Sequence, residues 1–185
     1  MLHGLKGDED VMWVLHSALP KGGLAVALRG LYAAEGGGFT WVKEKASALS
    51  GLADFTAAVD AVATTLDKLE RETGAPASGY VHMGFSQGVG LAFALVAADA
   101  VRPLGIAALA GFVPDGPLPG LGRLPVYWAH GTEDDQVPIG RAKQDVDRVR
   151  RAGADLTFCQ DDVGHKVGVA CMRGLKEWLL TRFED

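Results

Sequence analysis

The chain has 185 residues and a formal net charge of −5, with 48% apolar and 22% charged residues. We expect one soluble domain over residues 1–185, because this length suffices for a sizeable core and no linker divides it. The acidic balance and the lack of a Lys/Arg cluster exclude a typical nucleic-acid binder, and the apolar stretches are too short to span a membrane.

The N-terminal sequence MLHGLKGDED has neither the basic start nor the apolar core of a signal peptide, so we expect a cytoplasmic protein. Acidic residues from Asp8 to Asp10 precede an apolar-periodic run, which predicts a helix that ends before Pro20. The compact apolar run Leu24–Leu28 then predicts a buried strand.

The segment 32–41, YAAEGGGFTW, is expected to be a loop, because three successive glycines precede two aromatic residues. Phe39 and Trp41 have two interpretations: they tuck into the core, or they line a pocket for an apolar group. The residues alone leave both open. Apolar residues then recur at steps of three and four from Leu52 to Leu69, which predicts an amphipathic helix.

Short apolar runs alternate with helical patterns in the rest of the chain. The expected strands are 80–85, 105–112, 126–129 and 156–159, and the expected helices are 88–98, 138–152 and 167–182. This alternation predicts an α/β fold, with a mostly parallel sheet covered by helices on both faces. Ligand sites in such folds lie beyond the carboxyl ends of the strands, so the residues that follow each strand are the candidates for a site.

The chain has two cysteines, Cys159 in an expected strand and Cys171 in an expected helix, and no C-x-x-C pair. In a cytoplasmic protein this pattern favours two reduced, small buried side chains. A catalytic or redox thiol is the less favoured alternative.

The sequence GFSQG at 84–88 joins an expected strand to an expected helix. A strand, a sharp glycine-flanked turn with Ser86 at its apex and a buried helix are the context of a nucleophile elbow. Glycines suit both flanks, because the strand and the helix pass close together and the serine backbone is strained. In a chain with 25 glycines the motif alone could arise by chance, so its partners decide the interpretation.

The last two expected strands end at the groups that such a serine needs. One strand leads to the carboxylates of Glu133, Asp134 and Asp135, and the other leads to His165. A neutral imidazole can take the serine proton near pH 7 and return it to the leaving group, while a carboxylate fixes its tautomer. We predict Ser86 as nucleophile, His165 as base and acid, and Asp134 as orienting carboxylate, with its two acidic neighbours as alternatives.

No group of His, Cys, Asp and Glu in the sequence has the spacing of a metal site, so we predict no metal and no cofactor. His16 and His82 are expected to be structural. His130 is expected to hold the turn that presents Asp134.

These motifs resemble the phospholipase/carboxylesterase family of α/β-hydrolases, which includes bacterial carboxylesterases, lysophospholipases and acyl-protein thioesterases. The resemblance rests on GFSQG at 84–88, HGTEDDQVP at 130–138 and the pair Gly164-His165. The family pattern H-G-x-x-D-x-x-V-P points to Asp134 rather than to its acidic neighbours. The resemblance implies the α/β-hydrolase fold and ester hydrolysis.

Leu2-His3-Gly4-Leu5 resembles the family's L-H-G-x turn, which closes a central strand. By this resemblance the backbone N–H groups of Leu5 and Gln87 form the oxyanion hole. The chain departs from the family here, because only a stub of that strand precedes the turn and the N-terminal strands are missing or truncated. Three outcomes follow: the sheet adapts, another chain supplies the pairing, or the natural start lies upstream.

The leading hypothesis is a serine esterase that cleaves carboxylic esters of small to medium size through an acyl-enzyme on Ser86. An alternative is a thioesterase or lysophospholipase with the same three residues and a different pocket. An alternative of another class is a catalytically weak binding scaffold. The expected partner is a small-molecule ester, with no nucleic acid and no membrane span, and exposed sheet edges would favour a homodimer.

Overall fold

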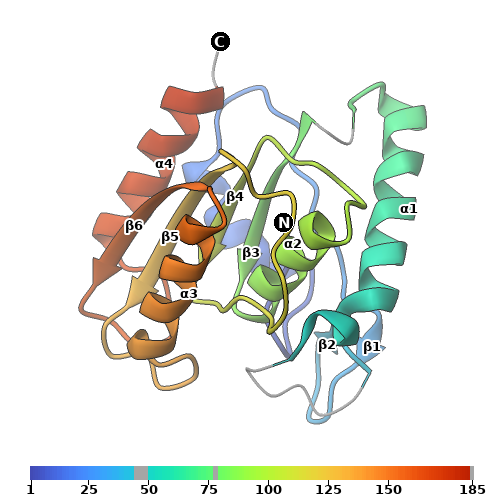
Figure 1. The fold of residues 1–185 in the computed structure, drawn as a ribbon. Helices are drawn as coiled ribbons and strands as arrows, with labels where there is room; N and C mark the ends of the chain where they lie inside the picture. Colours follow the sequence, from blue (N-terminus) through green and yellow to red (C-terminus); the bar gives the residue numbers. More distant parts are fainter. Residues whose placement is uncertain (44–49, 77–78, 184–185) are drawn as a thin grey trace.

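A four-stranded parallel sheet forms the centre of the protein in a computed structural model that describes residues 1–43, 50–76 and 79–183. The strands lie in the order β3-β4-β5-β6 (Figure 1). Their bounds are Val81–Phe85 for β3, Gly105–Leu109 for β4, Pro125–Gly131 for β5 and Asp155–Asp161 for β6. Every neighbouring pair in this sheet is parallel, as the alternating sequence pattern predicts.

Helices cover both faces of the sheet, which confirms the predicted α/β class (Figure 1). One face carries α1 (Thr56–Thr73), α2 (Gln87–Ala97) and α3 (Ile139–Arg151). The other face carries α4 (Val169–Phe183) and a 3₁₀ helix, η1 (Asp10–Ala18). Each face has its own cluster of buried apolar side chains, so the sheet is buried on both sides.

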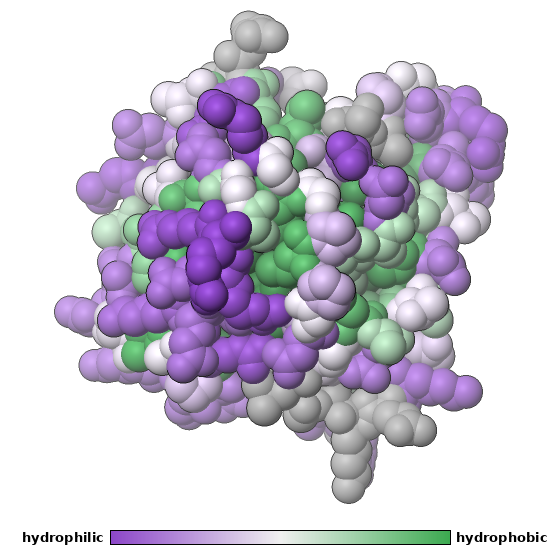
Figure 2. Space-filling model, viewed as in Figure 1, coloured by the Kyte–Doolittle hydropathy of each residue, from purple (hydrophilic) through white to green (hydrophobic). Residues whose placement is uncertain are grey.

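The charged helix α3 exposes a hydrophilic surface, whereas hydrophobic residues show toward the middle of the same view, around α2 (Figure 2). Ten of the eleven α2 residues are buried, Gln87 to Val96. A helix that is apolar on all sides must lie inside the fold. Because α2 begins directly after Ser86, this burial fixes the position of the serine relative to the sheet.

The long amphipathic helix begins later than the pattern predicts. Leu52–Phe55 form a short 3₁₀ helix, η2, and the regular helix α1 begins at Thr56. It ends at Gly74, whose φ of 74° lies in the left-handed region and whose N–H donates to the carbonyl of Glu70.

The N-terminal third differs most from the prediction. The predicted first helix is the 3₁₀ helix η1, and the predicted strand 24–28 is wrong, because only Leu28 of that run makes a bridge, to Leu2. Two further short strands, β1 (Tyr32–Ala33) and β2 (Phe39–Thr40), form an antiparallel pair. An apolar run becomes a strand only where a neighbour pairs with it. Among the described residues the segment before residue 28 forms no bridge, and its Val26 carbonyl accepts one bond, from the amino group of Met1.

Leu2 forms a one-residue stub of a central strand, as expected. Its N–H donates to the carbonyl of Met83 at 2.8 Å, and its carbonyl accepts from the N–H of Phe85 at 3.0 Å. On its other side, the N–H of Leu28 donates to the carbonyl of Met1 at 3.1 Å. Leu2 therefore lies between Leu28 and Gly84, with a single parallel bridge on each side.

A disulfide joins Cys159 of β6 to Cys171 of α4, so the expectation of two free thiols is wrong. Cys171 lies twelve positions after Cys159, across the turn that leads from β6 into α4, and the two Cα atoms lie 5.6 Å apart. This separation is typical of a disulfide. The sequence did not indicate the pairing because neither cysteine belongs to a recognisable motif.

Replacing both cysteines together, Cys159→Ser with Cys171→Ser, should lower the free energy of unfolding by about 3 kcal/mol, because the cross-link restricts the unfolded chain. Urea unfolding of the two proteins measures the difference. Wild-type protein unfolded in urea in the presence of dithiothreitol is the control. Its unfolding midpoint should be close to that of the double variant. Equal midpoints for oxidised wild type and variant would show that the bond does not stabilise the fold.

Candidate active site

Ser86 lies on a strained turn between β3 and α2, with φ 52° and ψ −115°. Its N–H donates to the carbonyl of Leu109 at the end of β4, at 2.9 Å. A Cβ at Gly84 would lie 2.5 Å from the carbonyl of Gly88, and one at Gly88 would lie closer still to the carbonyl of Leu2. Side chains at either flank would therefore clash with backbone, which is the close approach expected of a nucleophile elbow.

His165 and Asp134 meet at the same end of the sheet, beyond β6 and β5. The His165 Nδ1 atom lies 2.8 Å and 3.0 Å from the two carboxylate oxygens of Asp134. The Asp134 side chain is fully buried, whereas 21% of the His165 side chain is exposed. Because Nδ1 faces the carboxylate, Nδ1 carries the proton and Nε2 is left as an acceptor.

Backbone donors hold the Asp134 carboxylate in place. Its Oδ1 accepts from the N–H groups of Gln136 and Val137, each at 2.9 Å. His130 lies beside it, with Nε2 bonded to the carbonyl of Val137 at 2.8 Å, and burial lowers the pKa of this histidine. His130 is therefore neutral and donates to the turn, which agrees with its expected structural role.

His165 lies against the strand that leads to the serine. Its ring packs against Phe85, the residue before Ser86, with 5.1 Å between ring centroids. The three candidate residues thus gather at one edge of the sheet, which is the lower edge in Figure 1. Asp134 and His165 are joined by hydrogen bonds, and Ser86 directly follows Phe85, on which the His165 ring packs.

The turn that carries Leu5 packs onto the serine. A Cβ at Gly4 would lie 3.1 Å from the Cβ of Ser86. The fully buried His3 anchors this turn, since its Nε2 accepts from the N–H of Gly30 at 2.8 Å and its Nδ1 bonds to the carbonyl of Gly4 at 2.7 Å. Burial lowers the pKa of His3, so its imidazole is neutral. A neutral ring can accept from Gly30 at Nε2 while it donates to the Gly4 carbonyl from Nδ1.

Gln87 contributes through its side chain, which the sequence did not indicate. Its Oε1 atom accepts from the Thr40 hydroxyl at 3.1 Å and from the Trp41 N–H at 3.0 Å. Only 3% of Gln87 is exposed. A polar residue at the first position of an otherwise apolar helix is the one sequence signal for this contact. Its backbone N–H is in the first helical turn, which has no intrahelical acceptor.

Phe39 and Trp41 lie in different environments. Trp41 is 1% exposed, and its indole N–H donates to the carbonyl of His3 at 2.8 Å. These contacts favour the first interpretation, in which the indole belongs to the core. Phe39 is half-buried, and the Arg29 guanidinium lies over its ring at 4.8 Å.

Gln87→Met should lower the free energy of unfolding by about 2 kcal/mol, because it leaves the buried Trp41 N–H without its acceptor and takes the nearer of two acceptors from the Thr40 hydroxyl. Chemical denaturation measures the loss. Thr40→Val is the matched control, since it removes one of the two bonds together with its donor, and its loss should be smaller. A Gln87→Met protein as stable as wild type would show that the contact is not needed.

The parallel sheet, the helices on both faces and the serine turn at the sheet edge define an α/β-hydrolase-like fold. The model of the family described as Phospholipase/Carboxylesterase matches residues 37–182. The chain belongs to this family. No curated protein sequence matches the chain.

Solved structures share this fold. The Bacillus cereus carboxylesterase superposes with a TM-score of 0.87 at 21% identity, with 98% of this chain and 86% of that chain covered. For esterase PE8 the TM-score is 0.83 at 21% identity, with 98% and 90% covered. For SOBER1 from Arabidopsis thaliana the TM-score is 0.79 at 20% identity, with 99% and 97% covered. At these identities the likeness establishes the fold.

Within the described ranges, no helix is both long and apolar enough to cross a bilayer. In the same part of the chain, no three His, Cys, Asp or Glu side chains are arranged to hold a metal ion.

Proposed function

We propose that the protein is a serine hydrolase that cleaves carboxylic esters of small to medium size through an acyl-enzyme on Ser86. The observation that carries this proposal is the bidentate approach of the buried Asp134 carboxylate to His165 Nδ1, at the same sheet edge as a serine in a strained elbow. Family membership supports hydrolase chemistry in general.

In the proposed reaction, the Ser86 hydroxyl attacks the ester carbonyl while His165 Nε2 takes its proton. The tetrahedral intermediate collapses to the acyl-enzyme, and the imidazolium gives its proton to the departing alkoxide. Water then attacks the acyl-enzyme in the same way, with its proton passing to Nε2 and on to Ser86. Asp134 holds the ring and stabilises the imidazolium in both halves of the reaction.

The backbone N–H groups of Leu5 and Gln87 are the proposed oxyanion donors. The packing of Gly4 on Ser86 and the placement of Gln87 at the N-terminus of α2 support this role. Such donors act by stabilising charge that develops in the transition state. Phe39 is the proposed aromatic neighbour of the acyl group, since it stays partly exposed on β2, whereas Trp41 supports that segment from the core.

Two alternatives use the same site. A thioesterase or lysophospholipase would keep the three residues and differ in its acyl pocket, and a binding scaffold would keep the fold without turnover. No cofactor is needed for the proposed chemistry. The cytoplasmic location remains a prediction, although a disulfide is more typical of oxidising compartments.

A panel of p-nitrophenyl esters of increasing acyl length, run beside matching thioesters, tests the proposal. We expect turnover of short esters and covalent labelling of Ser86 by a fluorophosphonate probe, with the modified peptide identified by mass spectrometry. Faster turnover of long acyl thioesters would favour the thioesterase. A folded protein that neither turns over esters nor labels at Ser86 would favour the scaffold.

A further inference from the structure

The loop that carries His165 is closed at its base by the disulfide. We call residues 162–168 the histidine loop; it joins the end of β6 to the start of α4. The two cysteines are 12 positions apart, and His165 stands halfway between them. Cys159 and Cys171 are also the only cysteines in the sequence. The one cross-link of the chain therefore encloses the candidate catalytic base.

Apart from the disulfide, the histidine loop is held by few contacts among the described residues. Residues 162–167 are all half-buried or exposed. On the β5 side, the Glu133 N–H donates to the Val163 carbonyl at 3.1 Å. Val167 supplies the apolar contact of the loop with a core cluster. A segment with so little burial opens at a low cost in free energy unless its ends are restrained.

Polar contacts supplement the disulfide at the base of the loop. The Asp161 carboxylate accepts from the Cys171 N–H at 2.9 Å, and a Cβ at Gly168 would overlap the same carboxylate. Beside it the exposed Thr132 hydroxyl donates to Asp162 at 2.9 Å. These hydrogen bonds restrict the chain far less than a covalent cross-link does. The disulfide is therefore the main restraint on the loop ends.

The two sulfur atoms differ in their access to solvent. β6 is an edge strand of the sheet, and Cys159 is half-buried on it. Cys171, in the first turn of α4, is 1% exposed. Thiol–disulfide exchange requires that a thiolate reach one of the two sulfurs. A thiolate from solution has this access at Cys159 rather than at Cys171.

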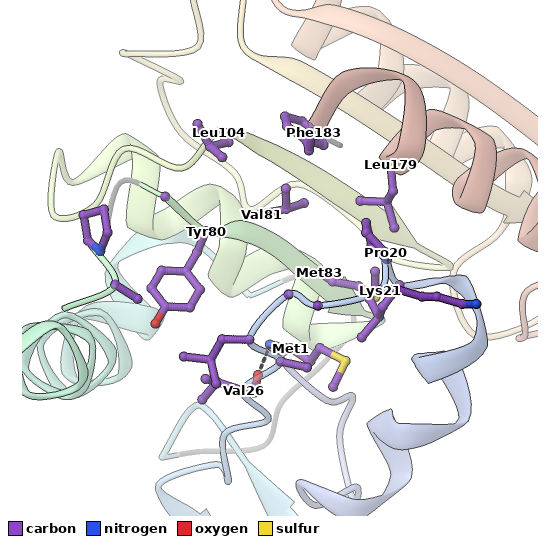
Figure 3. Close-up of a pocket in the computed structure, with 18 residues that line it drawn as sticks. Met1, Pro20, Lys21, Val26, Tyr80, Val81, Met83, Leu104, Leu179 and Phe183 are labelled. Atoms are coloured by element: carbon purple, nitrogen blue, oxygen red, sulfur yellow. Dashed lines mark hydrogen bonds between the residues drawn. The ribbon is translucent and has the colours of Figure 1, made fainter. Parts of the chain in front are cut away.

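Other contacts hold α4 to the sheet without help from the disulfide. The Tyr127 hydroxyl of β5 donates to the Cys171 carbonyl at 2.8 Å. At the other end of the helix, Leu179 is buried, and it lines a cavity of about 470 Å³ together with Phe183 and with Met83 of β3 (Figure 3). Loss of the disulfide therefore frees the histidine loop while α4 stays packed on the sheet.

We propose that the Cys159–Cys171 bond is a site of reversible exchange with a dithiol reductant and that its state controls the candidate base, an inference that rests on the proposed hydrolase function. A thiolate of the dithiol attacks Cys159 Sγ, and Cys171 leaves as a thiolate. The second thiolate of the reductant then attacks the reductant's own sulfur in the mixed disulfide. This step releases Cys159 and closes the reductant to a disulfide, and the two protons of the dithiol end on the two cysteines.

Reduction acts on the contact between His165 and Asp134. Asp134 keeps its place, because the N–H groups of Gln136 and Val137 hold its carboxylate from within its own turn. His165 moves with the freed loop and loses its fixed orientation. Because a small displacement of a catalytic group is costly, we expect kcat for a short ester to fall about tenfold. KM should change little, since the proposed ester contact, Phe39, lies outside the loop.

The test measures turnover of a short p-nitrophenyl ester by native wild-type protein before and after dithiothreitol, and again after reoxidation with oxidised glutathione. Alkylation with iodoacetamide and mass spectrometry count the free thiols. The matched control is Cys159→Ser with Cys171→Ser, which should have the kcat of the reduced protein and no response to dithiothreitol. All assays are run well below the melting temperature of the reduced protein, and circular dichroism checks that its helices remain.

Two further measurements follow the histidine loop without substrate. Hydrogen exchange of the Glu133 amide reports its bond to Val163, with the Ala107 amide of β4 as internal reference. The proton NMR signal of His165 Nδ1–H, assigned by its absence from His165→Asn, reports the contact with Asp134. On reduction we expect the Glu133 amide to exchange about tenfold faster and the Nδ1–H signal to disappear.

The outcomes separate this inference from the proposed function. Unchanged kcat after full reduction, a native disulfide that resists dithiothreitol, or a double variant as active as oxidised wild type would overturn the inference and leave the hydrolase proposal standing. No turnover by the oxidised protein would overturn the hydrolase proposal. The loop measurements then decide the inference, since an unchanged Glu133 amide and an unchanged His165 signal on reduction would overturn it.

Discussion

Ser86→Ala should lower kcat for p-nitrophenyl ester hydrolysis by about 10⁴-fold or more, with little change in stability. The expectation follows from the proposed covalent step, because no other group can form the acyl-enzyme once the hydroxyl is gone. Residual turnover should persist, since the proposed oxyanion donors of Leu5 and Gln87 remain. Initial rates with a short-chain ester, fitted for kcat and KM separately, measure the effect.

Ser86→Ala leaves the backbone of the elbow intact, so a difference in kcat from wild type reports the loss of the hydroxyl alone. Alanine accepts the same backbone, and the N–H of residue 86 can still donate to Leu109. Fluorophosphonate labelling should disappear in the same variant, and the melting temperature should stay within a few degrees. Equal rates for wild type and Ser86→Ala would remove the acyl-enzyme mechanism from consideration.

Asp134→Asn should lower kcat by about 10⁴-fold while preserving the fold. The amide oxygen can still accept from Gln136 and Val137, which hold the turn. The amide NH₂, however, would donate to His165 Nδ1 and leave the proton on Nε2. The imidazole would then present a proton, rather than a lone pair, toward the serine.

The neighbouring acids supply matched controls. Glu133 and Asp135 are exposed, and neither bonds to His165. Glu133→Gln and Asp135→Asn remove the same charge from the same turn, so both should keep kcat within about threefold of wild type. A large loss in either control, with a small loss in Asp134→Asn, would reassign the orienting carboxylate.

The serine turn and the contact between Asp134 and His165 were predictable, because they come from local signals attached to predictable elements. GFSQG indicates a strand–turn–helix unit, and the glycine contacts at 84 and 88 explain why no larger residue stands at either flank. The placement of Asp134 and His165 at one sheet edge followed from parallel strand order. Their hydrogen bond then required only that β5 and β6 be neighbours.

The side-chain role of Gln87 and the disulfide were not predictable, because each depends on contacts between distant segments. Gln87 bonds to residues 46 and 47 positions away. The pairing of Cys159 with Cys171 depends on how α4 packs against β6. Periodicity describes which face of an element is apolar, but it does not say which neighbour that face meets.

The sequence by itself determined the alternation of strands and helices, the serine elbow and the identity of the candidate base and carboxylate, because these depend on short-range backbone preferences and on motif spacing. Only the tertiary structure decided whether the N-terminal apolar run forms a strand. The run 24–28 has the composition of a strand, yet it forms one bridge, since among the described residues only Met1 and Leu2 bond to its backbone. Strand formation needs a partner for its backbone groups, and that partner is a property of the fold rather than of the run.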